Sequence, residues 1–261
     1  MPIYVVAKGS LVISMAKLKT PTTNQQTERS QESNASFFLD EIEGYGERVG
    51  NLDTYQYIRD SINEAIAGSE SLVDIGNGGV FDYDTTLVKQ ILAVDLFLES
   101  LPESYIRPVN VTFANGDALN LGASTASRDA VLIVMVLHHL IGRTVEESLK
   151  NIEQCIREAW RVLSPGGRLV IVESCVPRWF YQFECAIFPL ATAVINRVSA
   201  HPPTLQFTPE IISELLSRAT GCNAESQPIR QGRWVLQYGK KWPSALTPIR
   251  PYRFQVQRPP I

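Results

Sequence analysis

Residues 71–80, SLVDIGNGGV, join a short apolar run to three glycines, and this stretch decides the fold class. A run rich in aliphatic side chains is typical of a strand that is buried on both faces of a parallel sheet. Glycines that follow such a strand allow a sharp turn and let a ligand approach the backbone closely. The stretch therefore predicts a nucleotide-like ligand at the carboxyl end of a buried strand. It leaves open whether that ligand is a dinucleotide, a phosphate or another compound.

Composition limits the classes of protein that this chain can represent. Its 261 residues are enough for one sizeable domain. Its formal net charge of −3 gives no electrostatic reason to expect a nucleic acid or an acidic membrane as partner, although it is compatible with a local basic patch. No apolar run is long enough to span a bilayer, and the N-terminus lacks the basic region and cleavage site of a signal peptide. We therefore expect a cytoplasmic protein with no membrane span and no nucleic-acid partner.

The four cysteines do not form a metal-binding pattern. None lies in a C-x-x-C pair, and none has a histidine at the spacing of zinc ligands. Free thiols that pack as small hydrophobic side chains fit a reducing compartment. The sequence therefore predicts no metal site. The cysteines are Cys155, Cys175, Cys185 and Cys222.

Apolar periodicity continues on both sides of the opening stretch. Short apolar runs that are typical of strands alternate with patterns that are typical of amphipathic helices. This alternation predicts an α/β fold with a doubly wound, mostly parallel sheet, whose ligands bind at the carboxyl ends of the strands. The expected strands are 71–75, 90–97, 110–113, 129–137 and 168–172, and the expected helices are 51–67, 145–163 and 208–219.

The chain divides into three parts by composition. Residues 1–36 are polar and predict a flexible N-terminal arm. Residues 37–240 form the expected domain, in which the aromatic-rich segment 174–208 is an insertion that covers the substrate, and 226–238 hold a strand, a turn and a final strand. Residues 241–261 are rich in proline and basic residues, and we expect an extended tail on the surface.

The glycines do not fit a phosphate-binding loop. A dinucleotide fingerprint, G-x-G-x-x-G, requires glycine where this chain has Phe81, and no lysine stands where a Walker loop requires one. Asp74 precedes the first glycine by two residues, and a carboxylate there repels a pyrophosphate. It suits a cationic ligand such as S-adenosylmethionine, which carries a sulfonium and an ammonium group but no phosphate.

The segment LVDIGNGG resembles the first motif of class I S-adenosylmethionine-dependent methyltransferases, an acid followed by G-x-G-x-G. The resemblance implies that Asp74, Gly76, Asn77 and Gly78 bind the cofactor. The chain departs from the family at the third glycine, where it has Val80.

Further motifs follow in the family's order and extend the resemblance over about residues 70–175. In LAVDLF, Asp95 and Leu96 match the position that holds the ribose hydroxyls, and in FANGDALNL, Asp117 and Ala118 match the adenine-binding position. DAVLIVMVLHHL matches the fourth strand, and IREAWRVLSPGGRLVIVES matches the helix, turn and fifth strand. The resemblance implies a seven-stranded Rossmann-like sheet with an antiparallel last strand, S-adenosylmethionine as cofactor and S-adenosylhomocysteine as product.

Each assignment has a simpler structural alternative. Asp74 fits a capping or turn residue, Asp95 fits an ordinary acid at a strand end, and Asp117 fits an Asx turn beside Asn115–Gly116. Arg48 precedes the first strand, in a region that closes over the methionine end of the cofactor in related folds. It is a candidate partner of the cofactor carboxylate, or a surface arginine.

Three histidines and one glutamate are candidates for acid–base chemistry. His138 and His139 follow the fourth expected strand at its carboxyl end, and imidazole is the commonest general base in enzymes. His201 lies in the variable region after the fifth strand, and Glu173 ends that strand, where it could orient the substrate. The alternatives are that the histidines line or brace the pocket, and that Glu173 is solvated.

The aromatic segment after the fifth strand predicts an apolar wall over the carboxyl edge of the sheet. Trp179, Tyr181 and Phe183, with Phe188, are the candidate substrate-binding residues, and ordinary core packing is the alternative. The wall suggests a small hydrophobic or aromatic acceptor.

Together these features predict a methyltransferase that transfers a methyl group to an oxygen or carbon atom of a small hydrophobic or aromatic molecule. The resemblance is to ubiquinone/menaquinone-type and natural-product methyltransferases. Two alternatives stay open: an NAD(P)-dependent oxidoreductase, and a non-catalytic S-adenosylmethionine-binding protein that acts as a homodimer or as a partner subunit.

Overall fold

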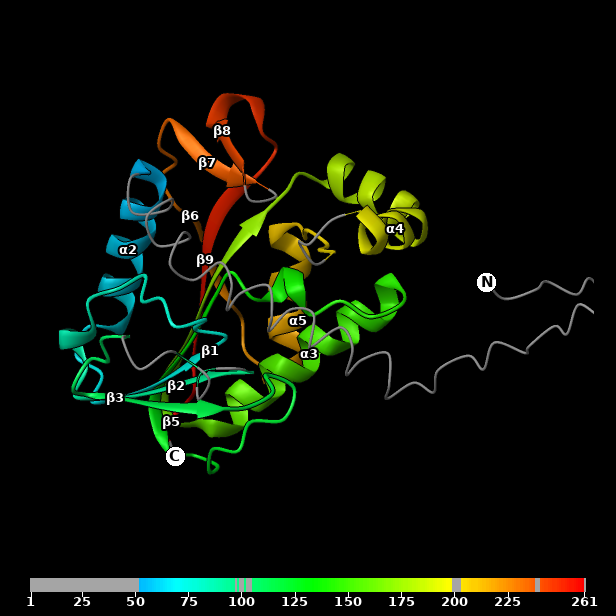
Figure 1. Cartoon of the computed structure of the whole chain (residues 1–261). Coiled ribbons are helices and arrows are strands. Elements are labelled where there is room, and N and C mark those ends of the chain that lie inside the picture. The colour runs from blue at the N-terminus through cyan, green and yellow to red at the C-terminus, as the bar shows by residue number, and fades with distance from the viewer. Residues whose placement is uncertain are drawn as a thin grey trace, which may run out of the picture.

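The computed structural model describes residues 52–96, 98, 101, 105–198, 203–237 and 240–260, with the side chains of 189–198 and 237 excepted. Within these residues the chain forms a sheet with helices on both of its faces (Figure 1). Residues 1–36, for which we predicted a flexible arm, lie outside the described residues.

A seven-stranded sheet has the strand order β3-β2-β1-β4-β5-β9-β6. The first five of these strands are parallel to one another, whereas β9 is antiparallel to both β5 and β6. This confirms the predicted mostly parallel sheet with an antiparallel last strand. The strands are β1 (Ser71–Ile75), β2 (Gln90–Asp95), β3 (Val111–Asn115), β4 (Arg128–Val134), β5 (Leu163–Cys175), β6 (Glu225–Pro228) and β9 (Arg250–Gln257).

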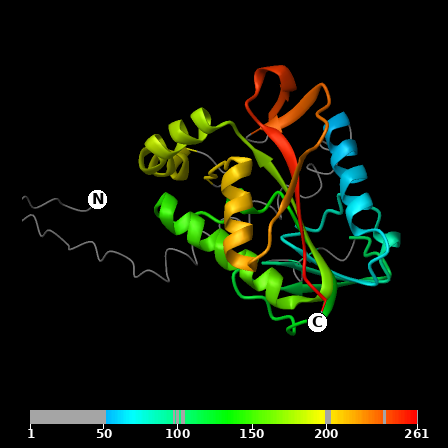
Figure 2. The same cartoon turned by 180° about the vertical axis from the view of Figure 1, so that it is seen from behind.

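The central strands are buried on both faces, which explains their continuous apolar sequence. Alternate residues of a strand point to opposite faces. In β4, Ala130 and Leu132 join the core on one face, whereas Val131 and Ile133 join the core on the other. Helix α2 (Asp53–Ile66) covers the first face, and α3 (Val145–Val162) with α5 (Pro209–Thr220) covers the second (Figures 1 and 2).

The predicted helix boundaries agree closely with these three helices. The side chain of Thr208 accepts a hydrogen bond from the Ile211 amide and caps α5, with proline at its first position. Helix α4 (Arg178–Val198) follows β5 and projects from the carboxyl end of that strand (Figure 1). Among the described residues, no helix is long and apolar enough to cross a membrane.

The connection from β1 to β2 contains no α-helix. Residues 76–89 form a glycine turn and one short 3₁₀ segment, η1 (Thr85–Leu87). Two further 3₁₀ segments are η3 (Leu137–His139), which follows β4, and η4 (Ser244–Leu246). The glycine loop is therefore not followed by the helix N-terminus that binds the pyrophosphate in dinucleotide-binding folds.

The C-terminal residues 241–261 are not a surface tail, which corrects the prediction. Strand β9 lies inside the sheet between β5 and β6, and Phe254 and Val256 are fully buried. The predicted final strand near Trp234 belongs instead to a separate hairpin, β7 (Trp234–Gln237) with β8 (Lys240–Pro243). The prediction was wrong because proline is unusual inside a sheet, and Pro251 within β9 hid the alternation of polar and apolar residues.

Candidate active site

The glycine loop forms a tight turn after β1. The amide of Val80 donates to the carbonyl of Asn77 over 3.1 Å, and both central residues have positive φ, 62° at Gly78 and 78° at Gly79. Positive φ at both central positions is the pattern of a type I′ turn, which requires residues such as glycine there. Val80 has no positive φ, so a β-branched residue is tolerated where the family has glycine.

Gly76 allows the close approach of β1 to the segment that follows β4. Its φ is +72°, and a Cβ atom built there would lie 2.3 Å from Cγ2 of Val136. The preceding residue, Met135, has an unusual φ of 54° for a non-glycine residue. The backbone is thus tightly constrained where the ends of β1 and β4 meet.

Asp74 is buried below the loop and braces it. Its Oδ2 accepts hydrogen bonds from Asn77 Nδ2 at 2.6 Å and from the hydroxyl of Tyr83 at 2.8 Å. Burial raises the pKa of Asp74 to about 7, although these two hydrogen bonds act in the opposite direction and the negative charges of Asp82 and Asp95 add to the increase. Burial also raises the pKa of Asp82 to about 6. The loop is therefore surrounded by carboxyl groups that a bound cation would stabilise in the ionised form.

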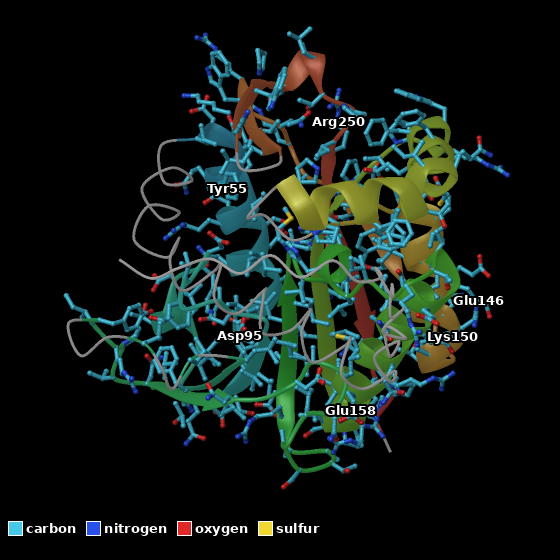
Figure 3. The ribbon with its side chains drawn as sticks, turned by 45° about the vertical axis from the view of Figure 1, so that its right-hand side comes forward. Tyr55, Asp95, Glu146, Lys150, Glu158 and Arg250 are labelled. Carbon is cyan, nitrogen blue, oxygen red and sulfur yellow. The ribbon has the colours of Figure 1, made fainter. Side chains whose placement is uncertain are left out.

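Asp95 closes β2 (Figure 3), and its carboxylate faces the same loop. Its Oδ2 accepts from the amide of Gly78 at 2.9 Å, and its Oδ1 accepts from the amide of Leu96 at 2.6 Å. Burial raises the pKa of Asp95, and the two amide donors lower it in part. A carboxylate has about four lone-pair directions, so these two bonds leave capacity for further donors.

Asp117 lies near Asp95 because the residue before it, Gly116, hydrogen-bonds to the Asp95 backbone. The amide of Gly116 donates to the carbonyl of Asp95 at 2.9 Å, which joins the ends of β2 and β3. The carboxylate of Asp117 accepts from the amide of Leu119 at 2.8 Å, which is the expected Asx-turn geometry. Ala118, the other predicted adenine-binding residue, is half-buried and packs against the core on the α3 side.

A buried glutamate holds one of the two adjacent histidines. Glu173 is fully buried, and its Oε1 lies 2.7 Å from Nδ1 of His138. The amide of Leu137 donates to Oε2, and the amide of Ser174 donates to Oε1, both at 2.8 Å. A carboxylate opposite Nδ1 favours the tautomer that carries the proton there, which leaves the lone pair on Nε2. Glu173 is therefore not solvated, and it orients His138.

The segment 203–208 is tied to this dyad. The amide of Leu205 donates to the carbonyl of His138 at 3.2 Å. The hydroxyl of Ser174 donates to the side chain of Gln206 at 2.9 Å, and Glu184 of α4 accepts from the Gln206 amide at 3.1 Å. The imidazole of His139 lies beside that of His138, with ring centres 4.2 Å apart.

Some residues of the predicted aromatic wall are buried, and others are exposed to solvent. Tyr181 is half-buried and its ring centre lies 6.2 Å from that of Phe207, and Phe188 is buried. Trp179 and Phe183 instead face solvent, with 64% and 56% of their surfaces exposed. These residues lie at neighbouring positions of one helix and point in different directions, so the prediction that they form a single wall was wrong for Trp179 and Phe183.

A cavity of about 920 Å³ opens at the carboxyl end of β5. It lies between the first turns of α4 and α5 and the start of β9. Its lining includes Val176, Tyr181, Gln182, Ile211, Arg250 and Tyr252.

Two predicted site residues, Arg48 and His201, lie outside the described residues. The structure adds two that the sequence did not indicate: Tyr83, which binds Asp74, and Tyr105, whose hydroxyl donates to the carbonyl of Gly79 at 2.5 Å. Neither belongs to a recognisable motif, so only a tertiary arrangement could identify them. In the described part of the chain, no group of three or more His, Cys, Asp or Glu could hold a metal ion.

The residues present fit a cationic adenosyl ligand better than a dinucleotide. Asp74 and Asp95 border the glycine turn, and their carboxyl groups disfavour a pyrophosphate at this position. No helix N-terminus follows the turn to offset that repulsion.

Comparison with known proteins gives the same assignment. Residues 73–171 match the family model described as a methyltransferase domain. A demethylmenaquinone methyltransferase of Paenarthrobacter aurescens (strain TC1) is 32% identical over 125 residues, which are 47% of this chain and 46% of that protein. The chain thus spans about half the length of the curated relatives it matches.

Solved structures share the fold at low identity. An S-adenosylmethionine-dependent methyltransferase of Thermotoga maritima has a TM-score of 0.53 at 16% identity, with 85% of this chain and 99% of that chain covered. Another, from Methanosarcina mazei, has a TM-score of 0.52 at 14% identity, with coverage of 77% and 98%. Residues 73–171 thus match a methyltransferase domain, and the sheet has the fold of S-adenosylmethionine-dependent methyltransferases.

Proposed function

We propose that the protein is an S-adenosylmethionine-dependent methyltransferase that methylates an oxygen or carbon atom of a small hydrophobic or aromatic molecule. The main supporting observation is a pair of carboxyl groups, the buried Asp74 and the half-buried Asp95, at a glycine turn that no α-helix follows. This combination favours a cationic, phosphate-free ligand on a fold shared with methyltransferases.

The residues around the turn would hold the cofactor. The carboxylate of Asp95 suits the ribose hydroxyls, because it can accept two hydrogen bonds from a cis-diol. Asp117 and Ala118 are the candidates for the adenine, and Gly76, Asn77 and Gly78 are the candidates for close backbone contact. When bound, S-adenosylmethionine supplies a methyl group on a positively charged sulfur, and S-adenosylhomocysteine is the product.

The proposed catalytic base is His138. Its Nε2 takes the proton from the acceptor oxygen or carbon as that atom bonds to the methyl group. Glu173 positions the ring through Nδ1 and stabilises the imidazolium that forms, and its own second oxygen is fixed by the amide of Leu137. Nucleophile alignment and exclusion of water are the other requirements of an in-line transfer, and the segment 203–208 above the dyad could supply them.

The acceptor class is inferred from the cavity at the carboxyl end of β5. The cavity at the end of β5 is lined in part by Tyr181 and Tyr252, which suit a flat apolar molecule. The curated relatives are named for demethylmenaquinone, a compound of this general kind. O-methylation and C-methylation both fit one base at the carboxyl end of β4.

Ligand binding tests the cofactor assignment first. Isothermal titration calorimetry should detect binding of S-adenosylhomocysteine to the protein. In a thermal-shift panel, S-adenosylhomocysteine should raise the unfolding temperature and NADH should not. Stabilisation by NADH alone would support the oxidoreductase alternative instead. Binding without turnover of any hydrophobic phenol or quinol would support the non-catalytic alternative.

Matched variants test the dyad. With a labelled methyl donor, His138→Ala should lower kcat by about 100-fold or more while the dissociation constant of S-adenosylhomocysteine stays unchanged. Glu173→Gln should lower kcat by a smaller factor with little change in KM, and imidazole in the buffer should partly rescue His138→Ala. His139→Ala is the matched control. An equal loss in this control, or none in His138→Ala, would contradict the assignment.

A further inference from the structure

The C-terminal part of the chain concentrates positive charge. Residues 226–261 contain seven of the 24 lysines and arginines and none of the 27 aspartates and glutamates. Strand β9 holds Arg253 against Glu64 of α2, at 2.9 Å. Of the other six cations, Arg258 lies over the ring of Trp160, and five are exposed in or near the segment that holds the β7–β8 hairpin. These five are Arg230, Arg233, Lys240, Lys241 and Arg250.

The same hairpin exposes large apolar side chains. Trp234 and Trp242 are 40% and 44% exposed, and Leu246 of η4 is 74% exposed. Nζ of Lys241 lies 4.9 Å from the ring centre of Trp234, so a cation and an aromatic ring share one outward face. Val235 is buried on the opposite face and anchors the hairpin to the body of the protein, and the exposed Lys240 and Trp242 share that face with it.

Helix α4 presents an apolar face to solvent. Trp179, Phe183 and Ile187, spaced four residues apart, are 64%, 56% and 37% exposed. Gln182 and Ala186 lie between them on the same exposed face, so no charge interrupts it between 179 and 187. A surface helix normally turns its charged side outward, and α4 reverses this arrangement.

These two elements project from the same end of the molecule. Figures 1 and 2 both show α4 and the β7–β8 hairpin at the end of the sheet where β5 finishes. The cavity at the end of β5 borders α4 and the segment that follows η4, because its lining includes Arg178, Tyr181 and Gln182 of α4 with Pro248 and Arg250. We call this surface the docking edge: Trp179, Phe183 and Ile187 of α4, Leu246 of η4, and the exposed residues of the hairpin, with Trp234 and Lys241 on one of its faces and Lys240 and Trp242 on the other.

We propose that the docking edge binds an anionic lipid surface. Tryptophan rings are enriched at membrane interfaces because one end is apolar and the other can donate a hydrogen bond to water or headgroups. Lysines beside them keep their charge among acidic headgroups while their methylene stems lie on apolar material. Both features meet on this edge, and the apolar face of α4 would enter the boundary between headgroups and acyl chains.

The charge distribution favours this partner over a second copy of the chain. No acidic residue lies in 226–261, so an anionic surface attracts the hairpin more than the net negative remainder of the chain. Two exposed acids near this end, Asp53 beside Gly232 and Glu210 at the cavity, weaken that attraction without reversing its direction. That separation orients the protein with the docking edge toward the lipid. Two hairpins facing each other across a two-fold axis would instead bring like charges together.

Docking would place the cavity mouth at the lipid, which gives an apolar acceptor a route that avoids water. This consequence rests on the proposed function. Membrane binding itself does not, because it is measured without cofactor or acceptor.

Vesicle binding by the full chain tests the inference. Sedimentation should show binding to vesicles of phosphatidylcholine with about 30% phosphatidylglycerol and little to phosphatidylcholine alone, and added salt should weaken it. Three of the four tryptophans lie on the docking edge, so their fluorescence should shift to the blue on binding. The double substitution K240Q/K241Q should lower the partition coefficient by roughly 25-fold, at about fivefold per lysine. W179A/F183A should lower it at least roughly tenfold.

Two control variants remove residues of the same kinds outside the docking edge. K89Q/K150Q removes two exposed lysines elsewhere, each paired with a glutamate, and Lys150 lies on α3 well away from the hairpin (Figure 3). Val109→Ala removes a fully exposed apolar residue just before β3. Both controls should bind vesicles as the native chain does, and all variants should unfold at the native temperature.

Several results would overturn the inference. One is absence of binding to the anionic vesicles, and another is an equal loss in K89Q/K150Q and K240Q/K241Q. A concentration-dependent dimer in sedimentation velocity that W179A/F183A abolishes, with vesicle binding intact, would make the α4 face a self-interface. Binding to a mixed-sequence nucleic acid duplex but not to vesicles would assign the cations to that partner. Loss of S-adenosylhomocysteine binding with intact vesicle binding would count against the proposed function alone.

Discussion

At the residue scale, Asp74 shows how one buried group can serve two roles. Its carboxyl group accepts from Asn77 and Tyr83, so it braces the glycine turn as a turn residue would. Its pKa is raised to about 7, mainly by burial, so its charge is not compensated within the protein. The structural and ligand-binding alternatives therefore do not exclude each other.

Asp74 should make stability depend on pH in a defined direction. Its pKa is raised in the folded protein, so between about pH 4 and pH 7 the folded state retains a proton that the unfolded state has released, and stability falls as pH rises. Between pH 4 and pH 8, the unfolding free energy of Asp74→Asn should rise relative to that of the native chain by on the order of 3 kcal/mol. Urea unfolding of both proteins across this pH range measures the difference in unfolding free energy. If that difference does not change with pH, Asp74 does not carry the proposed buried charge.

Asp95 should contribute directly to cofactor binding. Asp95→Ala is expected to weaken S-adenosylhomocysteine binding by about 1.5–3 kcal/mol, because it removes the acceptor proposed for the ribose and also frees the Gly78 amide. Calorimetry on the folded variant measures the change. Asp60→Ala, which removes an exposed acid of α2, is the control. An unchanged dissociation constant for Asp95→Ala would end this assignment.

At the element scale, the geometry of the glycine loop explains why the chain has Val80 where the family motif has its third glycine. The turn Asn77–Val80 places positive φ at its two central residues, which are both glycine, and Val80 only closes it. Tyr105 holds the carbonyl of Gly79 from outside. The shift of one glycine is thus a different turn geometry, in which valine is not strained.

Exchanging two neighbours tests this geometry without changing composition. The variant G79V/V80G restores the family spacing but places a β-branched residue at a φ of 78°. It should lose about 1–2 kcal/mol of unfolding free energy, the cost of a side chain in the left-handed region, and bind S-adenosylhomocysteine more weakly. Denaturant unfolding and calorimetry measure both effects. A variant at least as stable as the native chain would show that the turn differs in solution.

At the scale of the whole molecule, β9 completes the sheet from the far end of the sequence. It pairs with β5 from Arg168 to Cys175 and with β6 on its other edge. Arg258 just beyond it donates to the carbonyl of Leu163 and lies over the ring of Trp160. The end of the chain therefore holds the centre of the fold together.

Truncation should distinguish an inner strand from a tail. Removing 250–261 takes out β9 with the buried Phe254 and Val256, and exposes the edges of β5 and β6, so the product should not fold. Removing only 259–261, of which Pro259 and Pro260 are exposed, should leave the unfolding temperature nearly unchanged. Circular dichroism melts of the two products test this, and a cooperative transition in the longer truncation would contradict it.

The net charge of the whole chain does not describe the charge of each of its surfaces. The value of −3 for the whole chain gave no reason to expect an acidic surface as partner. The fold gathers exposed cations of 226–261 around one hairpin, beside a helix whose outward face is apolar. A sum over the chain cannot report such a separation, because it discards position.

The sequence by itself predicted the main strands and helices of residues 52–175, although β5 begins five residues earlier than predicted, and it indicated the glycine turn that we propose as the cofactor loop. These predictions rest on local periodicity and on residues close together in the chain. The sequence also placed His138 and Glu173 at strand ends. Only the tertiary structure decided that these two form one dyad, that Tyr83 braces Asp74, and that β9 belongs inside the sheet. Those contacts join residues far apart in sequence, and hydrogen bonding and burial between distant segments leave no periodic signal in either segment alone.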